Sequence, residues 1–328
     1  MNQRGGKLPG EFELIERLCG HICAGSRTIL GPGDDCAILA PSRRPILFTI
    51  DAMVEGVHFG LRWASPEVLG ARALTVNLSD IAAMGGRPTA CVVNLAVRKG
   101  ISLPVIDGLY AGLRRAARES AVDIVGGNIT SSRELSLTIA LLGEVGSATM
   151  RRDTAKVGDE VFVTGTLGDA ALGWRILAGK LRVPAGARKH LIARCVRPTA
   201  RIFAGQRLAA TSPTPAAIDV SDGLIQDLRH ILERSDVGAE IDAAALPLSA
   251  AYHTAVGSDL SYAMNGGEDY ELLFCVRPGH SEAGLSRRLR LQVRRIGKIV
   301  RGRRLKISGA DAAALAGWDH LRTGRSGR

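Results

Sequence analysis

Helical and strand-like patterns alternate along nearly the whole chain, and this alternation restricts its possible folds more than any other feature of the sequence. Residues 11–23 carry apolar side chains at a helical period, and residues 65–86 open with Ser-Pro-Glu, a helix-start pattern, and close at a Gly-Gly pair. Apolar runs of strand length occupy residues 45–50, which place Asp51 at the carboxyl end of a strand, and residues 89–97. Such an alternation is typical of an α/β or α+β fold.

The chain is long enough for two domains. It has 328 residues, and a globular domain takes up roughly 150. The composition becomes polar over residues 146–158, so we predict an N-terminal domain over residues 1–148 and a C-terminal α/β domain with a basic tail over residues 149–328. The further elements that we expect are helices at 104–120, 168–179 and 224–234, two helices after Pro184 of which the second starts at Thr199, and strands at 122–126, 135–145, 160–164, 216–220, 271–276 and 291–300.

The positive charge is concentrated at the C-terminal end. The formal net charge is +11 at pH 7; residues 287–328 hold 13 basic and two acidic side chains, and the other residues hold 30 of each. A basic tail could bind a nucleic acid. The alternative, which we prefer, is that residues 287–295 and 301–306 form strands with solvated arginines on one face. Aromatic residues make up only 4% of the chain, which argues against a platform for stacking bases.

Neither a membrane span nor a disulfide scaffold is expected. No apolar run reaches the roughly 18 residues that cross a bilayer, and the N-terminus lacks the apolar stretch of a signal peptide. The six cysteines are scattered, and the group Cys19, His21 and Cys23 lacks the second ligand pair that a structural zinc site uses. We therefore expect reduced, buried thiols, with Cys36 among them, in a cytoplasmic protein.

The motifs of several enzyme classes are absent. The sequence holds no G-x-x-x-x-G-K-[ST], no G-x-G-x-x-G, no H-E-x-x-H and no G-x-S-x-G. This argues against P-loop phosphate binding, dinucleotide binding, zinc proteolysis and α/β-hydrolase chemistry.

Acidic residues gather instead where apolar runs meet glycine-rich turns. They are Asp34, Asp35, Asp51, Asp80, Asp219, Asp222, Glu268 and Asp269. A single aspartate before a glycine is often only a turn former or a helix cap. Several carboxylates brought together repel one another unless a cation joins them, and Mg²⁺ binds carboxylate oxygens while keeping positions for phosphate oxygens. As a set, these residues favour a site for metal and phosphate.

Seven segments make the sequence resemble a known family. In order, GPGDDCAIL, TIDAMVEGVHF, ALTVNLSDIAAMGGRP, GGNIT, VTGTLGDAALG, AIDVSDGLIQDL and NGGEDYELLF are similar to the motifs of the thiamine-monophosphate kinases. The resemblance covers roughly residues 10–276 and resumes around Ile296-Gly297 and residues 317–320. The wider superfamily includes aminoimidazole ribonucleotide synthetase and selenophosphate synthetase, which use ATP without a Walker loop.

The resemblance implies both a fold and a reaction. It implies a homodimer in which the N-terminal sheets of two subunits pair into a shared β-barrel, with the active site in the cleft between the two domains of a subunit. It also implies transfer of phosphate from ATP to thiamine monophosphate, assisted by several Mg²⁺ ions, to give thiamine diphosphate and ADP. The acceptor phosphate has a second pKa of about 6, so it is mostly a dianion at pH 7 and needs no general base. Neither a membrane nor a nucleic acid is then an expected partner.

Site residues follow from the positions that match the family's motifs. Those that match magnesium ligands are Asp35, Asp51, Asp80, Asn128, Asp219 and Asp222, with Thr49 and Ile50 at flanking positions that can contribute oxygens. The expected catalytic residues among them are Asp51, Asp80 and Asp219. Those that match nucleotide-binding positions are Tyr110, Gly127, Asn128, Arg152 and Ser221. Those that match thiamine-phosphate contacts are His58, Glu268 and Trp318.

The chain departs from the family's pattern at two of these positions. Asn128 stands where the family usually has an aspartate, so a neutral amide oxygen replaces a charged metal ligand. Ile50 stands where threonine is common, which changes nothing if the ligand there is the backbone carbonyl. Two other functions stay open from sequence: another ATP-dependent synthetase of the same superfamily, and a basic nucleic-acid-binding protein.

Overall fold

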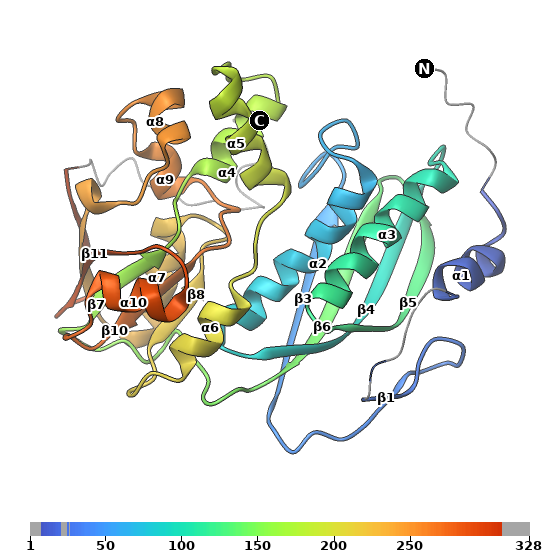
Figure 1. The fold of residues 1–328 in the computed structure, drawn as a ribbon, viewed down its shortest axis with the longest axis horizontal. Helices are drawn as coiled ribbons and strands as arrows, with labels where there is room; N and C mark the ends of the chain where they lie inside the picture. Colours follow the sequence, from blue (N-terminus) through green and yellow to red (C-terminus); the bar gives the residue numbers. More distant parts are fainter. Residues whose placement is uncertain (1–7, 21–24, 26, 310–328) are drawn as a thin grey trace. The chain divides into compact units, whose positions relative to one another are not determined.

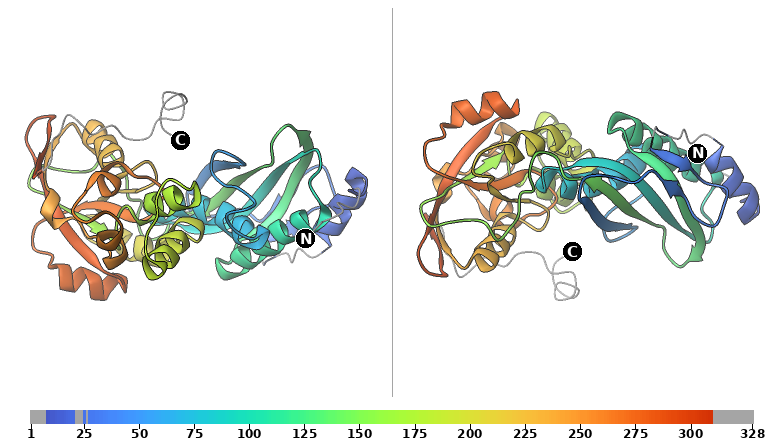
Figure 2. Two further views of the ribbon diagram at one scale, coloured as in Figure 1. Left: turned by 90° about the horizontal axis from the view of Figure 1, so that it is seen from above. Right: turned by 90° about the horizontal axis from the view of Figure 1, so that it is seen from below.

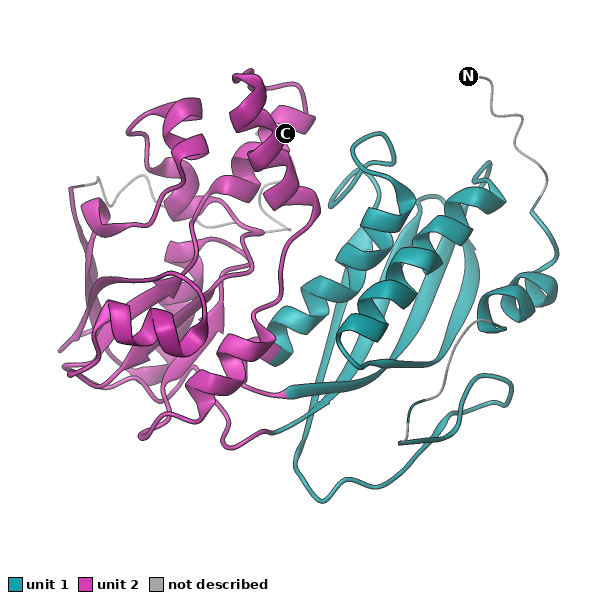
Figure 3. Cartoon of the chain, viewed as in Figure 1, with its two compact units in different colours: residues 1–81, 87–145 teal, residues 82–86, 146–328 magenta. Residues whose placement is uncertain are grey.

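The computed structural model describes residues 8–20, 25 and 27–309. The chain divides into two compact units, one made of residues 1–81 and 87–145 and the other of residues 82–86 and 146–328 (Figure 3). Each unit combines helices with a β-sheet, which confirms the mixed α/β class. The predicted domain bounds stay predictions, as does our expectation that the domain over residues 1–148 binds ATP and metal and mediates dimerisation.

The first unit is built on a four-stranded sheet with the strand order β3-β6-β4-β5. All neighbours are antiparallel except β4 and β5, which are parallel because helix α3 crosses over between them. A separate two-stranded ribbon pairs β1 with β2. The elements of this unit are α1 (Glu11–Cys19), β1 (Thr28–Leu30), β2 (Ile38–Leu39), β3 (Ile46–Val54), α2 (Pro66–Ala83), β4 (Arg87–Arg98), α3 (Leu103–Glu119), β5 (Asp123–Ser132) and β6 (Ser136–Glu144).

Helices α2 and α3 cover one face of this sheet (Figures 1 and 2). They approach closely because glycines stand where their backbones meet. A Cβ atom on Gly70 would lie 1.8 Å from the carbonyl oxygen of Leu109, and one on Gly112 would lie 1.8 Å from that of Glu67. A larger residue at either position would force the two helices apart.

The other face of the sheet carries apolar side chains that solvent reaches. Alternation along β3 turns Ile46, Phe48 and Ile50 to this face, where Phe48 is 69% and Ile50 61% exposed. Val92 of β4, which shares Ala140 as a partner with Ile50, is 41% exposed. Among the described residues, no helix covers this face (Figure 2). Apolar patches of this kind are common at the interaction surfaces of proteins.

The second unit is built on a six-stranded sheet with the strand order β12-β9-β11-β7-β10-β8. Its neighbours are antiparallel except for β12 and β9. The elements of this unit are β7 (Glu160–Thr164), α4 (Asp169–Leu177), α5 (Ala185–Val196), α6 (Ile202–Ala209), β8 (Ala216–Asp219), α7 (Leu224–Ser235), β9 (Gly238–Asp242), the 3₁₀ turn η1 (Ala243–Ala245), α8 (Ala250–Val256), α9 (Ser261–Asn265), β10 (Leu272–Val276), α10 (Glu282–Leu289), β11 (Val293–Val300) and β12 (Leu305–Ser308).

Both faces of this second sheet are buried. Strand β7 turns Val161 and Val163 into one core, which helices α4, α5, α7, α8 and α9 complete. It turns Phe162 into the other core, which α6 and α10 complete, and Phe162 stacks on Phe274 of β10 with ring centroids 5.7 Å apart. Burial on both sides explains why β10 is apolar at every position instead of alternating.

Several elements begin and end as the sequence predicts. Helix α2 starts at Pro66 directly after Ser65, β7 spans residues 160–164, and a turn at residues 221–223 separates β8 from α7. The first helix is described as far as Cys19, and the remainder of its predicted range includes residues outside the described part of the chain.

Other boundaries were predicted wrongly. Strand β3 does not end before Asp51 but continues to Val54, because β6 offers a partner as far as Ser136. Strand β5 likewise runs past residue 126 to Ser132, because β4 pairs with it along that length. Helix α6 begins at Ile202 and not at the predicted Thr199.

The basic C-terminal segment was also only partly predicted. Residues 287–289 close helix α10 and do not open a strand, because Leu285 and Leu289, one helical turn apart, are buried together. The strand β11 starts later, at Val293. Strand β12, at Leu305–Ser308, overlaps only the end of the strand predicted at residues 301–306. Elements β1, β2, β9, α8 and α9 were not predicted.

Three thiols follow the predicted burial, whereas Cys19 is only half-buried and Cys23 lies outside the described residues. Cys91, Cys195 and Cys275 are buried and free, and burial raises the pKa of the Cys91 thiol to about 12. Cys36 is exposed between β1 and β2, so its predicted burial is wrong.

Every helix that the structure describes is too short or too polar to span a membrane.

Candidate active site

In the first unit, side chains whose oxygen atoms could bind a metal lie close together where β3 faces helix α2. Alternation along β3 turns Thr49 and Asp51 to the same side. The Thr49 hydroxyl donates a short hydrogen bond to Asp80 Oδ2 of α2. The backbone N–H of Asp51 donates to Asn77 Oδ1, one turn earlier on that helix, at 3.0 Å. The structure therefore brings together Thr49, Asp51 and Asp80, three of the positions that match magnesium ligands, and their binding of metal stays a prediction.

Asn77 fixes the geometry of this group. Its side chain is fully buried, and its Nδ2 donates to the carbonyl oxygen of Ala73 at 3.0 Å while its Oδ1 accepts from Asp51. The amide is thus held at both ends, and it holds the backbone of Asp51 in turn. Asn77 is not among the predicted site residues, although its spacing of three residues from Asp80 puts both on one face of the helix.

Two other predicted residues of the first unit lie on the opposite, open face of the sheet. Ile50 alternates with Thr49 and Asp51 and turns away from α2. Asn128 of β5 pairs in register with Asn94 of β4, and its Nδ2 donates to Asn94 Oδ1 at 2.8 Å. Asn94 shares its partner Thr138 with Ala52, the residue after Asp51, so Asn128 is on the face of Ala52. Its role as a metal ligand stays a prediction.

The structure places the remaining predicted residues of the first unit separately. Asp35 is exposed in the segment between β1 and β2. His58 follows β3, and its Nδ1 accepts a hydrogen bond from the backbone N–H of Val54 at 3.1 Å. Tyr110 is buried in α3, and burial raises the pKa of its hydroxyl. Gly127 lies where a Cβ atom would come within 2.2 Å of a carbonyl oxygen of β4. Their functional roles stay predictions.

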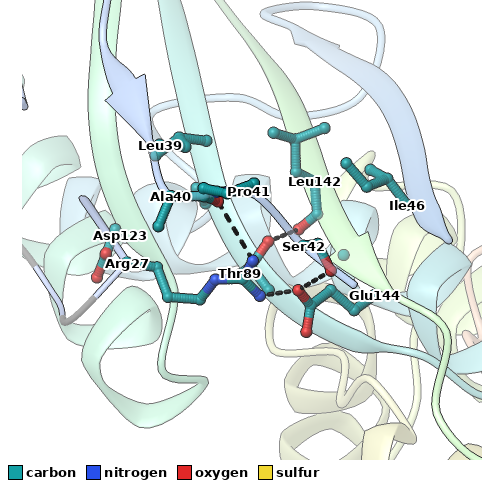
Figure 4. Close-up of a pocket in the computed structure, with 12 residues that line it drawn as sticks. Arg27, Leu39, Ala40, Pro41, Ser42, Ile46, Thr89, Asp123, Leu142 and Glu144 are labelled. Atoms are coloured by element: carbon teal, nitrogen blue, oxygen red, sulfur yellow. Dashed lines mark hydrogen bonds and ion pairs between the residues drawn. The ribbon is translucent and has the colours of Figure 1, made fainter. Parts of the chain in front are cut away.

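A small pocket in the first unit is lined in part by polar residues that contact one another (Figure 4). Its volume is about 210 Å³, and none of the predicted site residues lines it. The Arg27 guanidinium pairs with Glu144, and the Ser42 hydroxyl donates to the same carboxylate at 2.6 Å. The charges of Arg27 and Glu144 therefore compensate each other, and Asp123 accepts a hydrogen bond from the Thr28 hydroxyl at 2.6 Å. Since these polar groups have partners and none of the predicted site residues lines the pocket, it is not a candidate for the active site.

In the second unit, carboxylates gather at the turn between β8 and α7. Asp219 ends β8 and is buried, and the turn Ser221-Asp222-Gly223 follows. One oxygen of Asp227, Oδ2, accepts hydrogen bonds from the backbone N–H groups of Ser221, Asp222 and Gly223, each at 3.1 Å. Asp227 therefore fixes the backbone of both Ser221 and Asp222. Asp227 is not among the predicted site residues, although an acid four residues after the glycine, one helical turn into α7, is placed to reach back to the turn.

The charges at this turn fit a cation. Burial, and then the negative charges of Asp219 and Asp222, raise the pKa of Asp227 to about 8. Ligand atoms of Asp222, Asp227 and His230 all lie within 4.8 Å of one another. Like charges held this close cost free energy, and a divalent cation bound by carboxylate oxygens removes that cost.

Glu268 lies in a loop that is bonded to the same turn. Its backbone N–H donates to the carbonyl oxygen of Ser221 at 2.8 Å, and that of Tyr270 donates to Val220 at 2.8 Å. At Gly267 a Cβ atom would lie 2.2 Å from the Ser221 oxygen, so only glycine lets the two backbones approach this closely. The structure therefore brings Glu268 together with Ser221 and Asp222, all of them predicted site residues.

A buried ionic network fixes the end of this loop, at Glu271. Glu271, fully buried, accepts hydrogen bonds from Thr164 Oγ1 at 2.6 Å, Arg194 Nη2 at 2.8 Å and Arg201 Nε at 2.8 Å. Burial alone would raise the pKa of Glu271, but the hydrogen bond and charge of Arg201 and the charge of Arg194 outweigh it and lower the pKa. The carboxylate is thus ionised and joins β7, α5 and the segment before α6.

The two remaining predicted residues add little to the geometry. Arg152 is exposed, and its carbonyl oxygen accepts a hydrogen bond from Ser235 at the end of α7, at 2.8 Å. Trp318 lies outside the described residues. Neither position tests its predicted contact.

Basic residues of the C-terminal segment pair with acids elsewhere in the second unit. Arg294 pairs with Glu282 at 3.0 Å, and Lys298 pairs with Glu240 at 3.1 Å. This is the arrangement of a solvated strand with paired charges, which favours that interpretation of the basic segment over a nucleic-acid surface.

Comparison with known families covers both units. The model for "AIR synthase related protein, N-terminal domain" matches residues 33–145, and that for the C-terminal domain matches residues 156–309. Thiamine-monophosphate kinase of Salmonella typhimurium is 39% identical over 273 residues, which are 81% of this chain and 82% of that protein. Thiamine-monophosphate kinase of Mycobacterium tuberculosis is 33% identical over 317 residues, 94% of this chain and 91% of that protein.

Solved structures agree with this result. The crystal structure of thiamine-monophosphate kinase from Stenotrophomonas maltophilia superposes with a TM-score of 0.82 at 37% identity, over 92% of this chain and 98% of that one. A structure described as AaThiL complexed with AMPPCP and TMP superposes with a TM-score of 0.76 at 34% identity, over 95% and 97%. A hydrogenase maturation protein, HypE, shares the fold at 18% identity with a TM-score of 0.73.

Proposed function

The chain belongs to the thiamine-monophosphate kinase family, and we propose on that premise that it transfers the γ-phosphate of ATP to thiamine monophosphate, giving thiamine diphosphate and ADP. The observation that carries this proposal is the extent of the similarity. Relatives with this one activity are 33–40% identical to the chain, and the Mycobacterium tuberculosis enzyme matches 94% of it, across both units. The match therefore extends over both groups of carboxylates, where we propose that the reaction takes place.

Magnesium is the cation that we propose for these carboxylates. Asp51, Asp80 and Thr49 would hold ions in the first unit, and Asp219 and Asp222 would hold ions in the second, since all offer the hard oxygen ligands that Mg²⁺ takes. Ions bound there would neutralise the repulsion between an anionic acceptor and the anionic γ-phosphate. Asp35 and Asn128 remain proposed additional ligands, and the backbone of Ile50 a proposed neighbour.

The chain's own residues contribute chiefly position and charge. Asn77 fixes the backbone of Asp51, and Asp227 fixes the turn that carries Ser221 and Asp222. No side chain is needed as a general base, because a phosphate monoester with a second pKa of about 6 is already a dianion at pH 7. Catalysis of this kind depends on orientation and on electrostatic stabilisation in fixed geometry, without a covalent intermediate on the protein.

Substrate contacts complete the proposal. We assign the nucleotide to Tyr110, Gly127, Asn128, Arg152 and Ser221, and the thiamine phosphate to His58, Glu268 and Trp318. Support for these assignments is the match of each position to the family's motifs, together with the backbone bonds that hold Glu268 beside Ser221.

We further propose that the protein is a homodimer in which two copies pair through the open face of the first unit's sheet. The exposed side chains of Phe48, Ile50 and Val92 support this, because an apolar sheet face of this extent is stabilised when a second sheet covers it. Pairing of two such sheets would form the shared barrel that the family resemblance implies.

The proposed activity is tested by incubating the purified protein with ATP, Mg²⁺ and thiamine monophosphate and measuring thiamine diphosphate and ADP. The two products should accumulate in equal amounts, and chelation of the metal with EDTA should abolish both. ATP hydrolysis without thiamine diphosphate would point instead to another synthetase of the superfamily. Absence of ATP turnover with any acceptor would contradict the proposal outright.

A further inference from the structure

The loop that carries Glu268 has an unusual backbone. It joins α9 to β10, and two of its non-glycine residues have left-handed conformations, Glu268 with φ +68° and Tyr270 with φ +53°. Side chains disfavour this region, and such conformations persist only where the surroundings impose them. Asp269 lies between these two residues, so the contacts that fix Asp269 also determine the direction in which the Glu268 side chain points from the loop.

Asp269 is anchored to the start of helix α4. Its side chain is 2% exposed. Its Oδ2 accepts the backbone N–H of Gly168 at 2.6 Å, and its Oδ1 accepts that of Ala170 at 3.2 Å. These N–H groups belong to the first turn of α4, where they have no partner within the helix. A carboxylate from a loop a hundred residues away thus serves as the cap of this helix.

The residues on either side of Asp269 are anchored at the turn between β8 and α7. The backbone N–H of Glu268 donates to the carbonyl oxygen of Ser221 in this turn, and that of Tyr270 donates to the carbonyl oxygen of Val220, the residue before it. The loop is therefore held between two fixed elements, α4 through the side chain of Asp269 and the turn through its backbone.

We infer that Asp269 is the positioning residue for Glu268, and that binding of thiamine monophosphate depends on it although it does not touch the substrate. The inference rests on the proposed function, which assigns Glu268 to the thiamine phosphate. Without the anchor to α4 the left-handed backbone relaxes, and the Glu268 carboxylate moves away from the place where the substrate needs it.

The test compares Asp269→Asn with a matched control. Asparagine keeps the size of the side chain, but its NH₂ end cannot accept a hydrogen bond, so one of the two N–H groups of α4 loses its partner. The control is Asp159→Asn. Asp159 is also buried and also accepts a backbone N–H, that of Lys156 at 2.8 Å, but it lies at the opposite end of the β7–β10 pair.

Steady-state kinetics should separate positioning from a general structural effect. In Asp269→Asn the KM for thiamine monophosphate should rise at least about 10-fold, while the KM for ATP stays within about 2-fold. Asp159→Asn should change neither. In a Glu268→Gln background, which has no carboxylate left to position, adding Asp269→Asn should raise the KM by less than about 2-fold.

Three results would overturn the inference. They are an unchanged KM for thiamine monophosphate in folded Asp269→Asn, an equal rise in the KM for ATP, and an undiminished effect in the Glu268→Gln background. An unchanged KM in Glu268→Gln alone would overturn it as well, because Glu268 would then have no role to support. Failure of the proposed function is distinguishable, since the wild-type protein itself would then form no thiamine diphosphate.

A second variant covers the case in which Asp269→Asn does not fold. Gly267→Ala leaves Asp269 and Glu268 intact but places a Cβ atom 2.2 Å from the Ser221 oxygen, which pushes the same loop away from the turn. The KM for thiamine monophosphate should again rise at least about 10-fold. A folded Gly267→Ala protein with a normal KM would contradict the inference, because substrate binding would then be independent of the position of the loop.

Discussion

Replacing Glu271 with glutamine should destabilise the second unit strongly. The carboxylate is fully buried and is shared by Thr164, Arg194 and Arg201. The side chains of the two arginines are only 17% and 20% exposed, so water replaces the lost partner poorly. Removing one member of a buried ion pair costs about 3–5 kcal/mol, because the charge that remains is uncompensated. Since glutamine still offers one acceptor, we expect a loss of about 3 kcal/mol at pH 7.

The assay is urea denaturation followed by circular dichroism, with Thr164→Ser as the matched control. That variant removes one buried methyl group next to Glu271 but keeps the hydroxyl and every charge, so it should cost only about 1 kcal/mol. A loss in Glu271→Gln no larger than in the control would refute the reasoning, because the ionic network would then contribute nothing beyond packing.

The same pair of proteins gives a pH test. The folded-state pKa of Glu271 lies below its ordinary value of 4.5. The stabilisation from its charge is therefore present above pH 4.5 and is lost as the pH falls through the folded-state pKa. The difference in unfolding free energy between wild type and Glu271→Gln should therefore shrink as the pH falls below 4.5. A difference that grows or stays constant on acidification would show that Glu271 is not ionised in the folded protein.

Three further predictions concern the metal group, the open sheet face and the thiols. Asp51→Asn should lower kcat at least about 100-fold, the scale of losing one electrostatic group in a preorganised site, while circular dichroism stays unchanged; thiamine diphosphate formation at the normal rate would show that the assignment is wrong. Phe48→Glu should weaken self-association at least about 30-fold in sedimentation velocity, because it places a charge in the apolar face; an unaltered dimer would exclude this face as the interface. Iodoacetamide at about pH 8.5 should modify exposed Cys36 while Cys91, whose pKa is raised to about 12, and Cys275 stay unmodified until the protein unfolds; early labelling of either by mass spectrometry would contradict their burial.

Local signals in the sequence were sufficient for much of the fold. Helix α2 follows from Ser65 and Pro66 at its start, and the buried strands follow from short apolar runs between glycine-rich turns. Within the site, the spacing of Asn77 and Asp80 already places both on one face of α2. These features depend on residues close together in the chain, which is why periodicity and capping patterns detect them.

Features set by distant partners could not be predicted. The length of β3, which places Asp51 inside the strand, depends on where its antiparallel partner β6 begins, at Ser136. The face on which Asn128 lies depends on the register of β5 against β4, and a shift by one residue would reverse it. The role of Asp227 depends on a turn whose N–H groups converge only in the folded protein. Family motifs identify such residues as candidates without giving their geometry.

The most direct test of the proposed chemistry is a crystal structure with a non-hydrolysable ATP analogue, thiamine monophosphate and Mn²⁺ in place of Mg²⁺, with the metal located by its anomalous scattering. The account predicts Mn²⁺ ions within coordination distance of carboxylate oxygens of Asp51 and Asp80 in the first unit, and others within coordination distance of Asp219 or Asp222 in the second, with phosphate oxygens of the nucleotide among their ligands. Manganese bound elsewhere, or both substrates bound in order with these aspartates free of metal, would contradict it.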